Sequence, residues 1–127
     1  MATRPSFISG DVFTAVNANI LATSIVALNT QSGTAVTAAL TDVGKLISFT
    51  SGTAVAFTIP ANATVAFAVG DQINILQAGT ATVTITPAAT VTVRSSGAKL
   101  KTNDQYSLAT CIKIDTNEWV AVGNLKA

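Results

Sequence analysis

The sequence contains no histidine, only one cysteine and few charged side chains. Without His, the commonest general base and the commonest zinc ligand are missing, as is every Ser-His or Cys-His nucleophilic arrangement. Cys111 cannot form a disulfide within the chain, and in the alternating segment "YSLATCIKID" we predict that it is a small buried apolar residue. No Gly-rich phosphate loop follows a strand and opens a helix. We therefore expect no enzyme, no catalytic residues, no cofactor and no metal site.

Carboxylates are also scarce, and their spacing does not indicate the facing pair that a glycosidase needs. The six are Asp11, Asp42, Asp71, Asp104, Asp115 and Glu118. Three of them, Asp71, Asp104 and Asp115, follow or begin turn-like sequence, where Asp commonly hydrogen-bonds the local backbone. We predict structural roles in turns for these three.

Charge is low overall, at 10% of residues with a net charge of +1, against about 25% in an ordinary soluble domain. No basic run is interleaved with aromatics, so we expect no nucleic-acid partner. No segment approaches the ~20 apolar residues of a membrane span, and the N-terminus lacks an apolar core of signal-peptide length. We expect synthesis in a cytoplasm, no membrane, and a surface that is partly buried against other chains.

What the chain does have is a series of short, alternating, β-branched segments. They are "KLISFT" (45–50), "AVAFTIP" (54–60), "DQINILQA" (71–78), "ATVTITP" (81–87), "TVTVRS" (90–95), "YSLATCIKID" (106–115) and "EWVAVGN" (118–124). Turn signals such as "TSGT", "QAGT" and "DTNE" separate them at intervals of roughly ten residues. This pattern predicts a mainly β domain over residues 34–127, an antiparallel β-sandwich or barrel.

Alternation within these segments predicts which side chains face the core. In "ATVTITP" the inward residues are Val83 and Ile85, and in "TVTVRS" they are Val91 and Val93. The outward residues are mostly Thr, which suits packing against a neighbouring subunit as well as it suits water.

Residues 1–33 read as an extended arm followed by a helix. The helix is predicted over residues 14–28, with Thr14 as its N-cap and an apolar stripe along one face, and "NTQSGT" (29–34) should end it in a turn. Such a helix needs a packing partner, which is either its own sheet or the same helix of neighbouring subunits. The arm either folds back over the domain's own core or docks on another protein. We expect attachment or oligomerisation through a capsid or oligomer interface of Phe7, Ile8, Val12, Phe13, Leu21, Ile25 and Leu28.

Two aromatic residues are candidates for contact with a receptor. Trp119, the only Trp, could stack on a sugar if exposed, although covering one end of the sandwich near Ile112 or Ile114 is the simpler interpretation. Tyr106 likewise suits either a ligand contact or a structural hydrogen bond. The cations Arg94, Lys99 and Lys101 lie in a segment that reads as a solvated hairpin or a place where acidic groups dock.

The order of several blocks is similar to a known family. The blocks resemble a β-domain of bacteriophage virion proteins, including tail-fibre, head-fibre and decoration proteins. In order they are "DVGKLISF", "AVAFTIPANATVAFAVGDQINILQAGTATVTI", "VRSSGAKLKTNDQYSLATCIKI" and "NEWVAVGNL". That domain typically carries "TIPPN…FPVGTQI…Q…G…V" and then "R…GGKL…QYS…TLIKI…EW…GDL". The likeness covers about residues 40–125, with "PAN" in place of "PPN" and "FAVGD" in place of "FPVGT". The N-terminal "PSFISGDVFTAVNANILAT" also resembles the opening of many phage fibre-like proteins.

The resemblance implies a non-enzymatic structural component of a virion, assembled in the host cytoplasm and commonly a homotrimer. Its partners would be copies of itself and the major capsid protein or another virion protein. The first hypothesis is a capsid decoration (cement) protein or short head fibre that docks on the capsid through its N-terminal region. The alternative is a short tail fibre or adhesin that binds a host surface glycan or receptor through Tyr106 or Trp119. A carbohydrate-binding module without virion attachment is a more remote third class.

Overall fold

The computed structural model describes residues 27–127. The described chain is mainly β, with two short 3-10 turns, η1 (Leu40–Asp42) and η2 (Ser96–Ala98). Its strands are β1 (Leu28–Gln31), β2 (Ala35–Thr37), β3 (Leu46–Phe49), β4 (Val55–Ile59), β5 (Gln72–Gln77), β6 (Val83–Pro87), β7 (Thr92–Ser95), β8 (Lys101–Thr102), β9 (Leu108–Asp115), β10 (Glu118–Gly123) and β11 (Leu125–Lys126).

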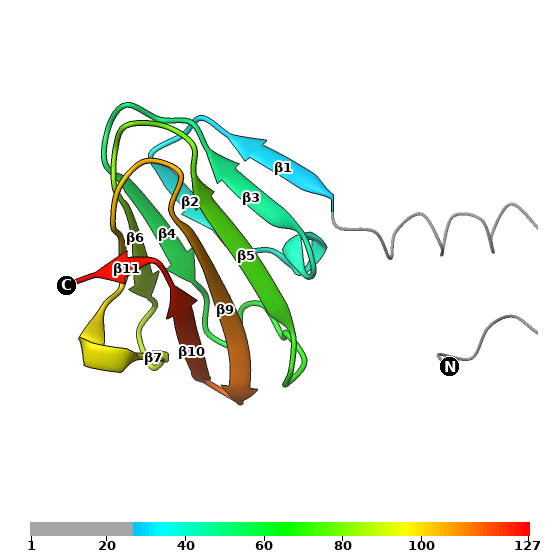
Figure 1. Cartoon of the computed structure of the whole chain (residues 1–127). Helices are drawn as coiled ribbons and strands as arrows, with labels where there is room; N and C mark the ends of the chain where they lie inside the picture. The colour runs from blue at the N-terminus through cyan, green and yellow to red at the C-terminus, as the bar shows by residue number, and fades with distance from the viewer. Residues whose placement is uncertain (1–26) are drawn as a thin grey trace, which may run out of the picture.

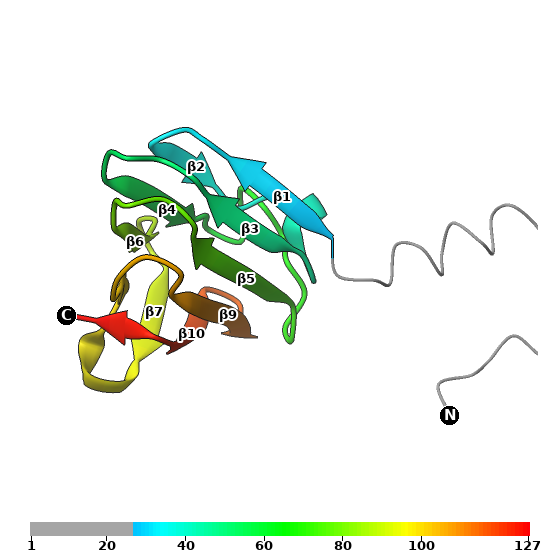
Figure 2. The same ribbon diagram turned by 45° about the horizontal axis from the view of Figure 1, so that its top comes forward.

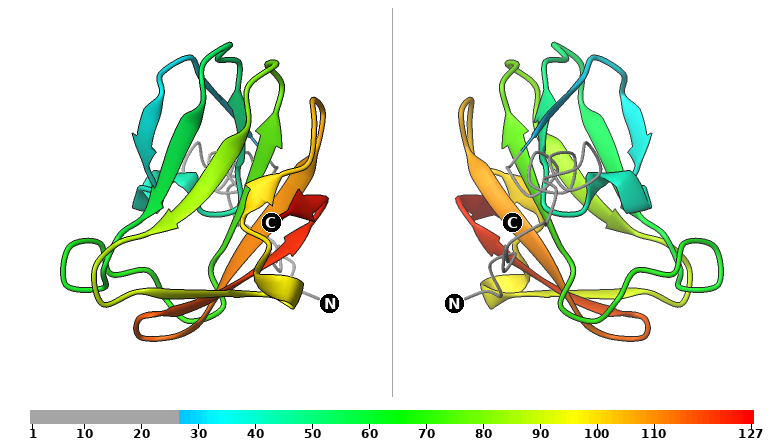
Figure 3. Two further views of the ribbon diagram at one scale, coloured as in Figure 1. Left: turned by 90° about the vertical axis from the view of Figure 1, so that its left-hand side faces the viewer. Right: turned by 90° about the vertical axis from the view of Figure 1, so that its right-hand side faces the viewer.

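These strands form two facing sheets, as Figure 1 and Figure 2 show. Sheet A has six strands in the order β1-β3-β5-β9-β10-β7, and sheet B has five in the order β11-β8-β6-β4-β2. The two layers are also visible in the views of Figure 3. The expectation of a β-sandwich is thereby supported at the level of a mainly β fold with two sheets.

The antiparallel part of the prediction was wrong, because both sheets are mixed. From β1 to β6 the chain alternates between sheet A and sheet B, so that β1, β3 and β5 are parallel neighbours in one layer. The strands β2, β4 and β6 are likewise parallel in the other layer. The first half of the domain is therefore a short two-sided winding, in which each connection crosses to the facing sheet.

The second half closes this winding with antiparallel strands. β9 pairs antiparallel with β5 and with β10, and β8 pairs antiparallel with β6 and β11. β7 then pairs parallel with β10 at the far edge of sheet A. Because both halves contribute strands to both sheets, they share a single core.

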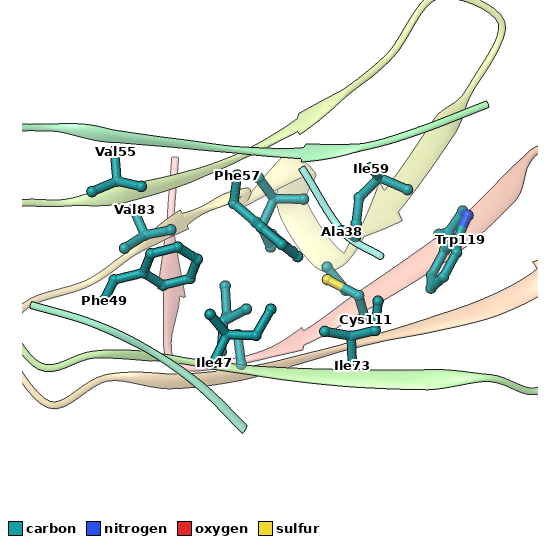
Figure 4. Packing of buried hydrophobic residues seen from close by; sticks show 14 of the residues in the cluster. Ala38, Ile47, Phe49, Val55, Phe57, Ile59, Ile73, Val83, Cys111 and Trp119 are labelled. Carbon is teal, nitrogen blue, oxygen red and sulfur yellow. The ribbon is translucent and has the colours of Figure 1, made fainter. Parts of the chain in front are cut away.

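The core lies between the sheets and is built from the inward residues of the alternating segments. Val83 and Ile85 are fully buried and Val91 is 8% exposed, as the alternation predicted. Figure 4 shows Phe57 and Ile59 pointing from β4 toward side chains of the other layer. The rings of Phe49 and Phe57 meet edge to face across the layers, with centroids 5.6 Å apart.

The start of the β domain differs from the prediction. Leu28, expected at the end of a helix, is the first residue of β1, and Asn29–Gln31, expected in a turn, continue that strand. β1 pairs with β3 in parallel register, Leu28 opposite Leu46. Pairing with β3 here overrides the local helical periodicity. The rest of the expected helix, at residues 14–26, lies outside the described residues.

Candidate interaction surfaces

The carboxylates expected in turns do hold turns. Asp71 Oδ2 accepts a hydrogen bond from the Ala68 amide at 2.8 Å, and Asp115 Oδ1 accepts one from the Thr116 amide at 2.7 Å. Asp104 Oδ1 instead accepts from the Ser107 hydroxyl, whose oxygen accepts in turn from the Asp104 amide at 3.0 Å. The structural interpretation of these three residues is confirmed.

Lys113 is a cation that sequence reasoning did not single out, and it is buried at 2% exposure. Its Nζ donates to Asn62 Oδ1 and to the Phe67 carbonyl, both at 2.6 Å. The backbone amide of Asn62 donates to Asn117 Oδ1 at 2.9 Å. These bonds attach the long β4–β5 connection to β9 and to the β9–β10 turn. A Lys at an inward position of an alternating strand is the signal that could have indicated this role.

A second buried polar group joins the two sheets. The Thr102 hydroxyl of β8 donates to Gln77 Oε1 of β5, and the Val83 amide donates to the Thr102 hydroxyl at 2.9 Å. Gln77 is 2% exposed, and its side-chain Nε2 donates a hydrogen bond to the Gly79 carbonyl at 3.2 Å. Within residues 27–127 no buried side-chain nitrogen or oxygen is left without a partner.

Cys111 lies in the core on β9, fully buried. Burial in apolar surroundings disfavours the thiolate and raises the pKa of the Cys111 thiol to about 12. A nucleophilic or metal-binding cysteine needs the opposite shift. Cys111 therefore behaves as the small apolar residue that the sequence predicted.

The two receptor-contact candidates have opposite environments. Trp119 is 1% exposed and packs edge to face against Phe67, with ring centroids 5.2 Å apart. It points inward, opposite Lys113 in the strand register, so its predicted neighbours Ile112 and Ile114 lie on the other face of the sheet. Burial removes Trp119 as a contact for a receptor.

Tyr106 is 71% exposed and has a left-handed backbone, with φ at 69°. Its amide donates to the Gln77 carbonyl at 2.6 Å, which holds the loop before β9 against β5. Tyr106 lies in the loop just before the first residue of β9, whereas Trp119 pairs with Lys113 near the other end of that strand. The structure does not bring the two aromatics together.

The outer face of sheet A is unexpectedly aliphatic. Its outward positions include eight aliphatic residues among polar ones such as Ser48, Gln72, Asn74 and Thr110, and we call this surface the aliphatic face. The eight are Leu28, Leu46, Leu76, Leu108, Ile112, Ile114, Val120 and Val122. Seven large apolar side chains are exposed among the described residues, and four of them (Leu28, Leu108, Ile114 and Val122) belong to this face. An open hollow of about 240 Å³ lies on it, lined by Leu46, Asn74, Leu108, Ala109 and Thr110.

The centre of the outer face of sheet B is rich in Thr and uncharged, as the sequence predicted, whereas the strands β8 and β11 carry Lys101 and Lys126 on this face. Its central outward positions carry Ala35, Thr37, Ala56, Thr58, Thr84 and Thr86, which we call the threonine face. None of the exposed large apolar residues lies on it. The two outer faces of the domain therefore differ in chemistry.

Of the predicted interface residues, Leu28 lies in the described part of the chain. It is 65% exposed and belongs to the aliphatic face. The others, Phe7, Ile8, Val12, Phe13, Leu21 and Ile25, lie outside the described residues.

Arg94 forms an ion pair with Glu118 on the neighbouring strand and remains largely exposed, while Lys99 and Lys101 are also exposed. Within residues 27–127 no three metal-ligating side chains come together. In the same part of the chain, the structure contains no helix with the length and apolarity needed to cross a membrane.

Comparison with known proteins gives no further assignment, because no family model and no curated protein matches this chain.

Proposed function

We propose that this chain is a non-enzymatic structural protein of a bacteriophage virion, a capsid decoration (cement) protein or short head fibre. It docks on the capsid through its N-terminal region, where Phe7, Ile8, Val12, Phe13, Leu21 and Ile25 supply the apolar contacts. Its action is mechanical: burying apolar surface against the shell stabilises the shell, at about 25 cal/mol per Å² buried.

The observation that supports this proposal is that residues of the motifs shared with the phage β-domain make the hydrogen bonds that hold the fold together. Asn62 of "IPAN" and Lys113 of "CIKI" hydrogen-bond to each other, and Asp71 of "VGD" closes its own turn. The backbone of Tyr106 in "QYS" joins two strands. These side chains and turns maintain the scaffold, so the resemblance concerns a framework and leaves the surfaces to carry the function.

A short tail fibre or adhesin is the second candidate, and the exposure of Tyr106 favours it. An exposed ring beside polar loop residues suits contact with a glycan. Because Trp119 is buried, this candidate has one accessible ring of the two that the sequence offered.

Co-sedimentation of the purified full-length chain with capsids that lack it tests the proposal. We expect saturable binding to capsids, and loss of binding in the double variant Phe7→Asp/Phe13→Asp. The matched control is Ala35→Asp/Ala56→Asp, which adds the same charge to the threonine face and should bind normally.

A chain that ignores capsids but binds host cells, with binding lost in Tyr106→Ala, would replace the head assignment by the tail-fibre alternative. A chain that binds neither would refute the virion proposal.

A further inference from the structure

The aliphatic face spans sheet A, with polar residues between its apolar ones. Strand register places one row of residues across β1, β3, β5, β9 and β10, which are labelled in Figure 1. This row is Leu28, Leu46, Asn74, Thr110 and Val122. A second row runs Gln72, Ile112, Val120 and Arg94. Apolar side chains thus extend from one edge strand to the last hairpin.

The polar side chains within this face already satisfy one another. Asn74 Oδ1 accepts from the Thr110 hydroxyl at 2.8 Å and from Gln72 Nε2 at 3.0 Å. Asn74 Nδ2 donates to the Lys45 carbonyl at 3.3 Å. Covering these three side chains would therefore cost less than covering unpaired polar groups, which lowers the penalty of burying polar atoms.

The charges on this face are balanced. Among the outward positions of the strands of sheet A, Arg94 and Glu118 are the charged residues, and they pair with each other. An identical face stacked on this one would bring no unpaired like charge against it. The face is thus compatible in charge with a copy of itself.

The size of the face is also sufficient. With strands ~4.8 Å apart and a rise of ~3.4 Å per residue, the six strands present a surface of roughly 24 by 20 Å. Two such surfaces in contact would bury on the order of 1,000 Å² in total, which reaches the lower limit for a specific interface.

We propose that the aliphatic face is the surface through which copies of this chain associate, with sheet A of each copy turned toward the others. This inference goes beyond the proposed function. Self-association was expected from the resemblance to the phage β-domain, and the inference names the strands that make the contact. The threonine face then points away from the assembly.

The test compares full-length variants by sedimentation velocity and native mass spectrometry. We expect the wild-type mass to be a multiple of the 12.9 kDa chain. Leu108→Lys/Val122→Lys should reduce it to a single chain at the same concentration, with at least a tenfold weaker association. The control Ala35→Lys/Ala56→Lys also places two lysines on neighbouring strands, but on the threonine face, and should keep the wild-type mass.

A second measurement remains informative if the lysine variant fails to fold. The variant Val122→Cys places a thiol on the aliphatic face, and Ala56→Cys places one on the threonine face, while Cys111 is buried. We expect a maleimide to label Ala56→Cys at least tenfold faster than Val122→Cys in the native assembly. Denaturation should equalise the two rates.

Three results would overturn the inference: a monomer with rapid labelling at Val122→Cys, a monomer in which that thiol is protected, or an oligomer that Leu108→Lys/Val122→Lys leaves intact. The protected monomer would mean that residues 1–26 cover the face. An assembly that depends on the face but does not bind capsids would uphold the inference and refute the head assignment. A monomer that binds capsids would refute the inference and support the head assignment.

Discussion

At the scale of single residues, the buried polar side chains of the described chain mainly stabilise the fold. Lys113 shows this best, because a buried ammonium group is costly unless it is well bonded. Its two acceptors, Asn62 Oδ1 and the Phe67 carbonyl, belong to the long connection between β4 and β5. The side chain of Lys113 therefore holds the middle of a loop whose end is joined to β9 by backbone hydrogen bonds at Gly70 and Asp71.

Replacing Lys113 by Met should lower the free energy of unfolding by about 2 kcal/mol, since both acceptors lose their donor while the aliphatic volume is kept. Urea denaturation measures the change. The control is Lys101→Met, which removes an exposed Lys from β8 and should change stability by less than about 0.5 kcal/mol. Equal effects from the two substitutions would contradict the structural role of Lys113.

At the scale of elements, the seven quoted segments correspond to β3, β4, β5, β6, β7, β9 and β10, because their alternation is regular. β8 and β11 have two residues each, too short for a period to show in the sequence. β1 was missed because "LNTQ" has little β propensity and gains its conformation from pairing with β3. The scaffold residues could be predicted where they occupy turns. For Lys113 the inward position in an alternating strand indicates burial, but its partners Asn62 and Phe67 could not be predicted, since they lie far along the chain.

One strand end depends on a glycine. Gly123, the last residue of β10, has φ at 136°, and a Cβ there would lie 2.4 Å from the Leu108 carbonyl oxygen. β10 and β9 approach each other too closely at this point for any side chain.

Gly123→Ala should therefore lower the free energy of unfolding by about 3 kcal/mol, through backbone strain and displacement of β9. Thermal or urea denaturation gives the value. Gly33→Ala provides the matched control, because a Cβ at Gly33 meets nothing within 4 Å. If the two variants are equally stable, the close approach of β10 and β9 is wrong.

At the scale of the whole molecule, the parallel winding was not predictable from alternation. A strand has the same period of two whether its neighbour is parallel or antiparallel. Connections such as 50–54 are as short as hairpin loops, because the chain steps to the facing sheet about 10 Å away. The aliphatic face was not predictable for a related reason. Its residues come from separate segments of the sequence, and only the order of the strands in sheet A makes them neighbours.

The interlocking of the two halves predicts a single unfolding transition. β9 completes sheet A against β5, and β8 continues sheet B from β6, so neither half has a core of its own. Far-UV circular dichroism follows all strands, whereas fluorescence follows Trp119 on β10. At one protein concentration the two urea curves should coincide. Separate midpoints would show that the winding and the closing strands unfold independently.

The first coil of the winding leaves β1 and β2 as edge strands, one in each sheet. A winding with open edges has no fixed number of turns: another coil laid beside β1 and β2 would extend both layers and lengthen the core without disturbing the closing strands. Inserting or removing one such pair of strands would therefore change the width of the sandwich without changing its other parts. A relative of different length could keep the same closing hairpin and the same outer faces, differing only in how far it reaches.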